Sequence, residues 1–396
     1  MTTLERTTSA LEAIEQIAPI IREYADQSER EATLARPIVD ALIEHGLFRQ
    51  LTPKSLGGAE VDPVTWFKTV EAAARIDGST GWCLFINGGT GFIGSRMTEE
   101  AAEELIANPA TIIAGGVFPF GRAEVVEGGY RVTGRWPFSS GCKHSTIIGG
   151  MCVVFDGQAP RMTPMGPELR MCGLPAEQVE IIDNWEVSGL TGTGSHDFAL
   201  NGAFVPERYA INMLSRPENR YYTGPLYAMP FISLFGLPMA AVALGIAQHS
   251  IDVMLEVAQT KVPAAMAATD PKPLQQRPLF HLQLGEAMAL VRSARAWMHE
   301  ALNEAFEVAK AGQPADMAVR NNLYSAASNA TRSSRQAVEL MYLAGGGGAN
   351  YRKSPLQRCL RDIFALTQHA ATSPQSLENS GAMFAGLPAP LPLLLL

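Results

Sequence analysis

Apolar residues recur at helical spacing from the start of the chain. In the first run they lie three or four positions apart, at Leu11, Ile14, Ile17 and Ile21. This periodicity predicts an amphipathic helix, which Pro19 is expected to kink or break. A second run over 34–46 ends near Gly46. The chain is therefore expected to begin with helices.

The pair Asp62-Pro63 marks the start of a further helix. Aspartate accepts hydrogen bonds from the first turn of a helix, and proline fits its first position. The apolar pattern predicts this helix over 64–76, a break over 77–80 and a new helix from Gly81. Another turn or two follows over 99–105. We therefore expect residues 1–110 to form a helical domain.

The pattern changes between residues 111 and 222. Short alternating or β-branched runs, separated by Gly, Pro, Asn and Asp, predict strands there. Examples are TIIAGGVF (111–118), STIIGGMCVVF (145–155) and DFALNGAFV (197–205). Glu127-Gly128-Gly129 lies between two such runs and indicates a hairpin. We expect a central β-domain, a barrel or a sandwich, over 111–222.

Residues 223–396 are predicted to be helical again. Long apolar-periodic segments over 239–262, 279–310 and 316–343 are typical of a four-helix bundle. A final helix is expected from Pro355 to about Ala371. The segment 230–247 carries no charge and approaches membrane-spanning length, but it contains Pro238 and lacks a basic flank. We interpret it as a buried helix.

Composition narrows the class of protein. The 396 residues are 47% hydrophobic and 18% charged, which is typical of a large globular protein. The net charge is −8 and no basic run occurs, so nucleic acid is not expected as a partner. Five cysteines show no metal-ligand or disulfide spacing. The N-terminus lacks an apolar signal segment, and we expect a reduced, cytoplasmic protein.

The stretch VTGRWPFSSGCKH, residues 132–144, is the most informative chemically. Trp136 and Phe138 are two positions apart, so a regular strand would place both rings on one side. The turn Ser139-Ser140-Gly141 would add hydroxyls and approachable backbone N–H groups. A planar ring system with polar edges, such as a flavin, needs this combination. The alternative is ordinary packing inside a β-domain.

Several motifs in register resemble the acyl-CoA dehydrogenase fold, and specifically its flavin-dependent monooxygenase branch. They are RIDGSTGW (75–82), GRWPFSSGCKH (134–144), GLTGTGSHDF (189–198), FVPERY (204–209), the glycine run 345–348 and LQRCLRDIF (356–364). The resemblance spans nearly the whole chain. It implies an α+β fold with an N-terminal helical domain, a central β-domain and a C-terminal four-helix bundle.

The resemblance also implies which residues contact the cofactor. In this family the aromatic strand and turn lie against the flavin, here Trp136, Phe138, Ser139, Ser140 and Gly141, with Ser140 near the flavin N5. A second flavin-contacting loop would use Thr191, Thr193, Gly194 and Ser195; a plain β-turn is the alternative. Gly346 and Gly347 would approach the flavin of a neighbouring subunit, which implies a homotetramer. A helix C-cap is the alternative there.

The last motif separates dehydrogenases from oxygenases. Acyl-CoA dehydrogenases need a carboxylate base, usually in a Glu-Gly pair shortly after the Arg-Asp motif. No such pair follows Arg361-Asp362, and Glu378 lies past a proline. His369 falls in this region instead, as in the oxygenase branch, and could protonate or deprotonate a substrate. A surface histidine near a helix end is the alternative.

The oxygenase branch implies reduced flavin, FAD or FMN, from a separate reductase. Reaction with O2 would give a C4a-hydroperoxide, which needs a dry pocket. Candidates for its lining are Trp82, Phe85, Thr90, Phe118 and Phe120, although core packing is the default for such residues. No GxGxxG nucleotide site follows a strand, so the reductase is not expected in this chain.

Two sequence differences from the phenol-hydroxylating relatives restrict the class of substrate. The histidine and the serine that hold the phenol oxygen there fall near Thr90 and Gly115 here. We therefore expect a bulkier, more apolar substrate such as an indole, and oxygenation at nitrogen or sulfur stays open. A true acyl-CoA dehydrogenase and a flavin-fold protein without catalysis are the competing hypotheses.

Overall fold

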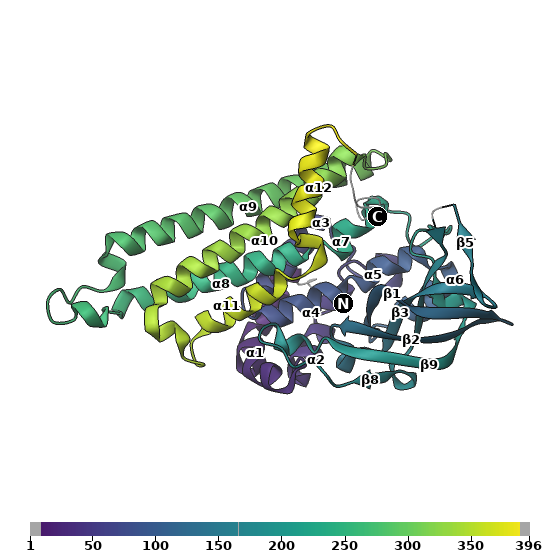
Figure 1. The fold of residues 1–396 in the computed structure, drawn as a ribbon, viewed down its shortest axis with the longest axis horizontal. Helices are drawn as coiled ribbons and strands as arrows, with labels where there is room; N and C mark the ends of the chain where they lie inside the picture. Colours follow the sequence, from purple (N-terminus) through teal and green to yellow (C-terminus); the bar gives the residue numbers. More distant parts are fainter. Residues whose placement is uncertain (1–8, 165, 389–396) are drawn as a thin grey trace, which may run out of the picture. The chain divides into compact units, whose positions relative to one another are not determined.

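The computed structural model describes residues 9–164 and 166–388, which form two compact units (Figure 1). Unit 1 comprises the described residues up to Asp62 together with Cys83–Val187 and Thr191–Ala228. Unit 2 comprises Pro63–Trp82, Ser188–Leu190 and the described residues from Met229 onward. The sequence-based domain boundaries at 110 and 222 stay a prediction.

Helices dominate the N-terminal part, as predicted. The first helix, α1, is continuous from Ala10 to Glu31 with Pro19 inside it, so the expected break does not occur. Ser9 and Glu12 form a reciprocal capping box at its start. The other helices of this part are α2 (Arg36–Glu44), α3 (Pro63–Ala74), α4 (Gly78–Gly88), α5 (Thr90–Ile93) and α6 (Glu99–Ile106). The predicted start of α3 at Pro63 is confirmed.

Helix α4 begins three residues earlier than predicted. The carboxylate of Asp77 accepts hydrogen bonds from the backbone N–H and the hydroxyl of Thr80, each at 2.8 Å. This is the capping geometry of a helix N-terminus. The Asp-Gly-Ser-Thr segment therefore starts the helix, and the predicted break over 77–80 is wrong.

The central strands form one main sheet in the order β10-β7-β3-β1-β2-β9-β8. The hairpin predicted at Glu127-Gly128-Gly129 is confirmed, since Val126 pairs with Gly129. β1 also pairs with β3 in parallel. The strands are β1 (Ile113–Val126), β2 (Gly129–Ser139), β3 (Ile147–Asp156), β4 (Ala159–Pro160), β5 (Met162–Thr163), β6 (Gly166–Pro167), β7 (Leu169–Pro175), β8 (Glu180–Ile182), β9 (His196–Pro206) and β10 (Ala210–Ile211).

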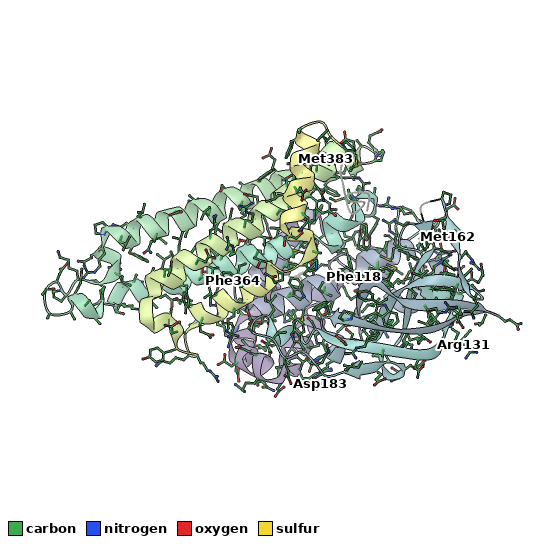
Figure 2. All side chains as sticks on the ribbon, in the orientation of Figure 1. Phe118, Arg131, Met162, Asp183, Phe364 and Met383 are labelled. Atoms are coloured by element: carbon green, nitrogen blue, oxygen red, sulfur yellow. The ribbon has the colours of Figure 1, made fainter. Side chains whose placement is uncertain are left out.

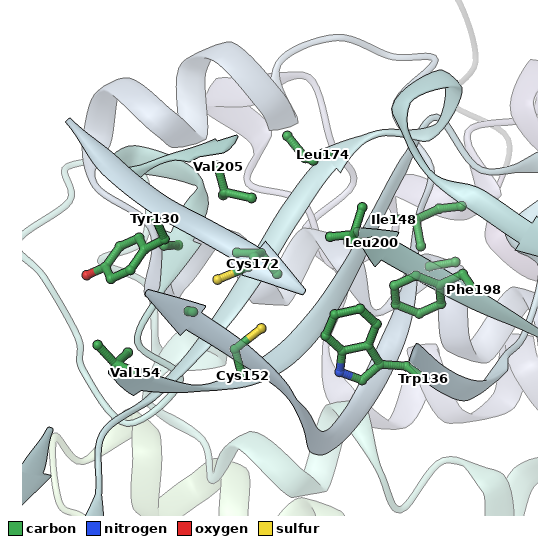
Figure 3. Packing of buried hydrophobic residues seen from close by; sticks show 14 of the residues in the cluster. Tyr130, Trp136, Ile148, Cys152, Val154, Cys172, Leu174, Phe198, Leu200 and Val205 are labelled. Atoms are coloured by element: carbon green, nitrogen blue, oxygen red, sulfur yellow. The ribbon is translucent and has the colours of Figure 1, made fainter. Parts of the chain in front are cut away.

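The indole of Trp136 belongs to the core of the sheet and lies beside Phe198 (Figure 3). It stacks on Phe198 at 4.9 Å between ring centroids, and its Nε1 donates to the carbonyl of Met151 at 2.8 Å. Glycines on three strands leave room for the ring, because a Cβ on any of them would overlap it. They are Gly116 and Gly121 on β1, Gly134 on β2 and Gly150 on β3. The ring and these glycines therefore hold the strands in register.

Unit 2 is a helical bundle in which α10 lies against both α8 and α9 (Figure 1). The helices of this part are α7 (Phe231–Phe235), α8 (Met239–Thr260), α9 (Pro278–Lys310), α10 (Met317–Gly345), α11 (Pro355–Leu366) and α12 (Pro374–Phe384). The three long predicted helices are confirmed. The final predicted helix is too long, because α11 ends at Leu366 and α12 was missed.

The apolar segment around α8 is a core helix. The stretch Ser233–Met266 is long and apolar enough to cross a membrane, but 83% of its most apolar window is buried inside the protein. The interpretation of this segment as a buried helix is therefore confirmed.

Candidate active site

The two aromatic side chains of the β2 motif do not share a face. Trp136 pairs with Phe198 and Ser139 with His196, so β2 has one extra residue in between. This bulge turns the chain, and Phe138 takes a φ of +64°. Trp136 is 0% exposed and Phe138 is 62% exposed. The prediction of one aromatic face is therefore wrong, and the enclosed Trp136 offers no ring surface to a cofactor.

Phe138 is left as the accessible ring at this end of the sheet. Its ring is edge-on to Trp185, with centroids 6.1 Å apart. A positive φ is uncommon for a bulky residue and marks local strain. The fold therefore holds Phe138 outward at an energetic cost, directly before the Ser139-Ser140-Gly141 turn.

Three hydroxyl groups form a chain behind this turn. The Oγ of Ser195 lies 2.7 Å from the Oγ of Ser140 and 2.7 Å from the Oγ1 of Thr193. The backbone N–H of Gly141 donates to the carbonyl of Thr193 at 2.9 Å. The turn and the predicted second loop are therefore hydrogen-bonded to each other within unit 1, and their contact with a flavin stays a prediction.

Asn87 is hydrogen-bonded to the turn. The sequence did not single it out as a site residue. Its amide group donates to the carbonyls of Ile113 at 3.1 Å and Ser140 at 3.4 Å. Its Oδ1 is therefore free to accept from His144 Nε2 at 3.1 Å. A Cβ on Gly141 would meet both Asn87 and His144, so glycine is required there. Asn87 was detectable as the polar residue within the apolar run of α4.

Two polar atoms near the turn are buried without a hydrogen-bond partner in the described structure. They are the Oγ of Ser139 and the Nδ1 of His144. Burial lowers the pKa of His144 to about 4, so the ring is neutral at neutral pH. Since Nε2 carries the proton that Asn87 accepts, Nδ1 is a bare acceptor. Such orphaned atoms are costly and are found where a ligand binds.

The residues that follow the loop Thr191–Thr193 pack against neighbouring backbone. Gly194 has a φ of +52°, and a Cβ there would meet the carbonyl of Ala32. His196 accepts backbone N–H groups from Asn184 and Trp185 at Nδ1 and donates from Nε2 to Ala32. Burial lowers the pKa of His196, so it is a neutral structural bridge.

The predicted pocket residues of unit 1 fall into two groups. Phe85 is buried in α4, and Thr90 is buried with its hydroxyl donating to the carbonyl of Asn87 at 2.6 Å. Phe118 and Phe120 are 46% and 58% exposed on β1, and their stacked rings have centroids 5.8 Å apart. Thr90 therefore contacts the candidate site through Asn87, whereas Phe118 and Phe120 form a separate exposed pair.

His369 and Trp82 are brought together within unit 2. Their ring centroids are 5.8 Å apart in an edge-on arrangement. His369 is not on α11, as was predicted, but precedes the short turn Ala370–Thr372, and its Nδ1 accepts the N–H of Ala371 at 3.2 Å. Burial lowers the pKa of His369 to about 4. The proton of the neutral ring therefore lies on Nε2, which makes the outer nitrogen a donor.

Asp362 anchors the segment that leads into the Thr191 loop. Its buried carboxylate accepts the N–H of Leu190 at 2.6 Å, and Arg361 donates to the carbonyl of Ser188 at 2.5 Å. Burial and the nearby Asp77 carboxylate raise the pKa of Asp362 to about 7, against the opposing hydrogen bond from Leu190. The Arg-Asp motif therefore holds residues 188–190 in place through hydrogen bonds to their backbone.

Replacing Asp362 with asparagine is expected to stabilise the protein at high pH only. A raised folded pKa favours the protonated form, so the wild type loses stability as pH rises from about 4 to about 7. Asparagine can still accept from Leu190 but never ionises. Its advantage should therefore grow across this window, to a few kcal/mol at about 1.4 kcal/mol per pKa unit, and then stay constant.

Thermal unfolding followed by circular dichroism across this pH range measures the difference. Asp40→Asn, a change of a surface carboxylate on α2, is the control and should show no such trend. A difference between Asp362→Asn and wild type that does not change with pH would contradict the titration of Asp362 in this range.

The glycines after α10 are exposed. Gly346 has a φ of +52°, and nothing within 4 Å would meet a Cβ on Gly347. Backbone geometry therefore explains Gly346, but no contact within the described chain requires glycine at 347.

Comparison with known proteins identifies the family. Residues 6–111 match the acyl-CoA dehydrogenase N-terminal domain and residues 237–374 the acyl-CoA dehydrogenase C-terminal domain. The chain is 32% identical to an indole-3-acetate monooxygenase of Pseudomonas putida, over 96% of this chain and 95% of that protein. It is 30% identical to the flavin-dependent monooxygenase oxygenase subunit HsaA of Mycobacterium tuberculosis H37Rv, over 93% and 92%.

A solved structure agrees with these relatives. The crystal structure of the 3-HSA hydroxylase from Rhodococcus sp. RHA1 superposes with a TM-score of 0.86 at 27% identity, over 96% of this chain and 97% of that one. Its similarity covers both the sheet and the helical bundle. The chain therefore belongs to the flavin-dependent monooxygenases that are built on the acyl-CoA dehydrogenase fold.

Proposed function

We propose that this protein hydroxylates an aromatic heterocycle of the indole type, using O2 and reduced flavin that a separate reductase supplies. The relative from Pseudomonas putida is named for indole-3-acetate, and HsaA is named an oxygenase subunit, which implies a partner that reduces the flavin. The single observation that carries the proposal is the outward Phe138 beside the Ser140–Ser195–Thr193 hydroxyl chain.

These residues fit a flavin. Phe138 presents a flat ring, and the hydroxyl chain offers donors and acceptors for the polar edge of a ring system. Strained backbone conformations such as that of Phe138 are concentrated at binding and active sites. A bound flavin would supply the oxygen-activating chemistry, and Ser140 would tune it through a hydrogen bond.

His369 is proposed to donate a hydrogen bond to the substrate or to a reacting oxygen. Because Nδ1 is occupied by the Ala371 N–H, the free Nε2 of the neutral ring can only donate. A low pKa keeps it neutral over the physiological range. Donation without a change of charge differs from the general-base role, which would need a pKa nearer neutrality.

A simple phenol fits this site poorly. The Thr90 hydroxyl already donates to Asn87, and a side chain on Gly115 would overlap the carbonyl of Gly149. Neither position therefore provides the two hydrogen bonds that hold a phenol oxygen in related hydroxylases. An indole ring has a single polar group, its N–H, and therefore matches this site better than a phenol.

A homotetramer is part of the same proposal. Gly347 is exposed and nothing in its own chain requires it to lack a side chain, which supports close approach by a second copy or its cofactor. A cytoplasmic location is supported by the cysteines, since all five lie in the described residues, are buried and form no disulfide there.

The proposal is tested by mixing the anaerobic protein with reduced flavin, then with O2 and indole or an indole derivative. Product, H2O2 and flavin reoxidation are measured together. We expect hydroxylated product, with little H2O2. In Ser140→Ala, loss of the hydroxyl should raise H2O2 per turnover roughly tenfold, because one hydrogen bond to a polar ring edge is worth about 1–2 kcal/mol.

Ser293→Ala is the matched control, since Ser293 is an exposed residue of α9 in unit 2. It should leave the H2O2 yield unchanged. Complete release of H2O2 with every indole, together with bleaching of bound oxidised flavin by an acyl-CoA, would instead support a dehydrogenase.

A further inference from the structure

Unit 1 contains a cavity of about 190 Å³ that lies outside the site residues described above. Its lining includes Ser95, Arg216, Tyr222, Thr223 and Tyr227. Whole small-molecule sites usually enclose about 300–1,000 Å³. The cavity is therefore of the size expected for one substituent of a ligand, or for a small ligand.

The chain connects this cavity to the candidate active site. Thr90, which donates to Asn87 below the turn, is the first residue of α5, and α5 leads directly into the turn Gly94–Arg96. Phe92 in the same segment stacks on Tyr227 at 6.2 Å. Tyr227 in turn donates to the carbonyl of Leu51 at 3.2 Å. The segment 90–96 therefore contains both Thr90, which donates to Asn87 beside the turn, and Ser95, which lines the cavity.

Two arginines make the cavity positive. Arg96 adjoins the lining residue Ser95, and Arg216 lines the cavity itself. Burial, and next the charge of Arg216, lower the pKa of Arg96 to about 10, so both side chains remain charged at neutral pH. Arg216 also donates to the carbonyl of Tyr227, and an anion in the cavity would be attracted by both positive charges.

The hydroxyl of Tyr222 supplies an uncharged donor. It is buried and has no hydrogen-bond partner in the described structure. The ring is held edge-on by Tyr227 at 4.7 Å, and a Cβ on Gly94 would overlap the hydroxyl, so its position is fixed. Burial raises the pKa of Tyr222, which keeps the proton on the oxygen. An unpaired buried donor of this kind calls for an acceptor from a ligand.

An acidic group lies beside one lining residue of the cavity. The Glu60 carboxylate lies near Gly224, one of the lining residues, and accepts the N–H of Lys54 at 3.0 Å. An anion would therefore be held at the arginine side, away from Glu60.

We propose that this cavity binds the carboxylate of an acidic aromatic substrate, with Arg96, Arg216 and Tyr222 as its donors. The inference rests on the proposed hydroxylase function and names its substrate class: an indole or similar ring that carries a short carboxylate arm. Paired guanidinium groups and a phenol are donors that match the oxygens of a carboxylate. The ring would then be positioned by its charged arm as well as by apolar contacts.

The test compares indole-3-acetate with its uncharged isostere indole-3-acetamide. The full-length protein is assayed with reduced flavin and O2, and kcat and KM are measured for each compound. We expect the wild type to favour the acid by about tenfold or more in kcat/KM, as one charge-assisted hydrogen bond implies. Arg216→Gln and Tyr222→Phe should each raise KM for the acid about 10–100-fold, with kcat nearly retained.

Arg216→Gln should leave KM for the amide within about twofold, because it removes a charge that only the acid needs. Tyr222→Phe removes an uncharged donor, so it should raise KM for the amide as well, but less than KM for the acid. Tyr222→Phe removes a hydroxyl without a protein partner and is expected to keep or raise the melting temperature, so a loss of affinity would not reflect misfolding. Arg131→Gln is the charge-matched control: Arg131 is exposed on β2 (Figure 2) and should affect neither compound.

The outcomes separate this inference from the proposed function. Equal turnover of acid and amide by the wild type would leave the hydroxylase intact and overturn the carboxylate site. Equal losses for both compounds in Arg216→Gln would assign the arginine a structural role and also overturn it. Release of H2O2 without product from either compound would overturn the hydroxylase, and the inference with it.

Discussion

Replacing His369 with alanine is expected to lower kcat for hydroxylation by about 10²–10⁴-fold, the usual range for loss of a positioned donor or acid. The Nδ1 of this histidine accepts the N–H of Ala371, so the proton of the neutral ring is on Nε2. Steady-state product formation in the presence of excess reduced flavin measures the effect. His281→Ala, on the exposed surface of α9, is the control and should leave kcat unchanged.

His369→Gln distinguishes a donor from a base. The glutamine amide can place an N–H near the position of Nε2, so it should restore much of the activity if His369 only donates. If His369 instead acts as a base, glutamine should be as inactive as alanine. The wild-type kcat should also be flat from about pH 8 to about pH 5, because the pKa of His369 lies near 4.

Replacing Trp136 with alanine is expected to cost about 3–5 kcal/mol of folding free energy. The indole is 0% exposed, stacks on Phe198 and fills a space that glycines on three strands leave open. The surrounding backbones cannot close over the resulting cavity without breaking the sheet. Deletion also leaves the carbonyl of Met151 without its donor.

Chemical denaturation followed by circular dichroism measures this cost. Phe204→Ala is the matched control, because Phe204 is an exposed aromatic residue on β9 of the same sheet. Its loss should change stability by less than about 1 kcal/mol. A similar cost for the two variants would contradict the central role of Trp136 in the core.

Much of the fold was predictable because its signals are local. The Asp62-Pro63 start, the hairpin at Glu127-Gly128-Gly129 and the long periodic helices each depend on a few neighbouring residues. The family assignment used motifs spread along the whole chain, and the relatives confirm it. For the same reason the predicted use of reduced flavin and O2 by an oxygenase is confirmed at the level of the family.

The geometry of the site was harder to predict because it depends on exceptions to regular structure. A period of two assumes an uninterrupted strand, and the bulge before Ser139 breaks it. His369 lies in an Ala-rich stretch with helical character, but its own side chain takes the Ala371 N–H and helps end the helix.

Long-range partners were also missed. Tyr222 and Gly94 are more than a hundred residues apart, and no local pattern links them.

The division of the chain into two units also limits how the protein can be dissected. The chain passes from one unit to the other after Asp62, Trp82, Val187, Leu190 and Ala228. No single cut therefore releases either unit as a continuous polypeptide, and helix α4 itself is shared between them. Neither unit can therefore be exchanged between proteins as one continuous segment. During synthesis, more than half of the chain must be made before either unit is complete.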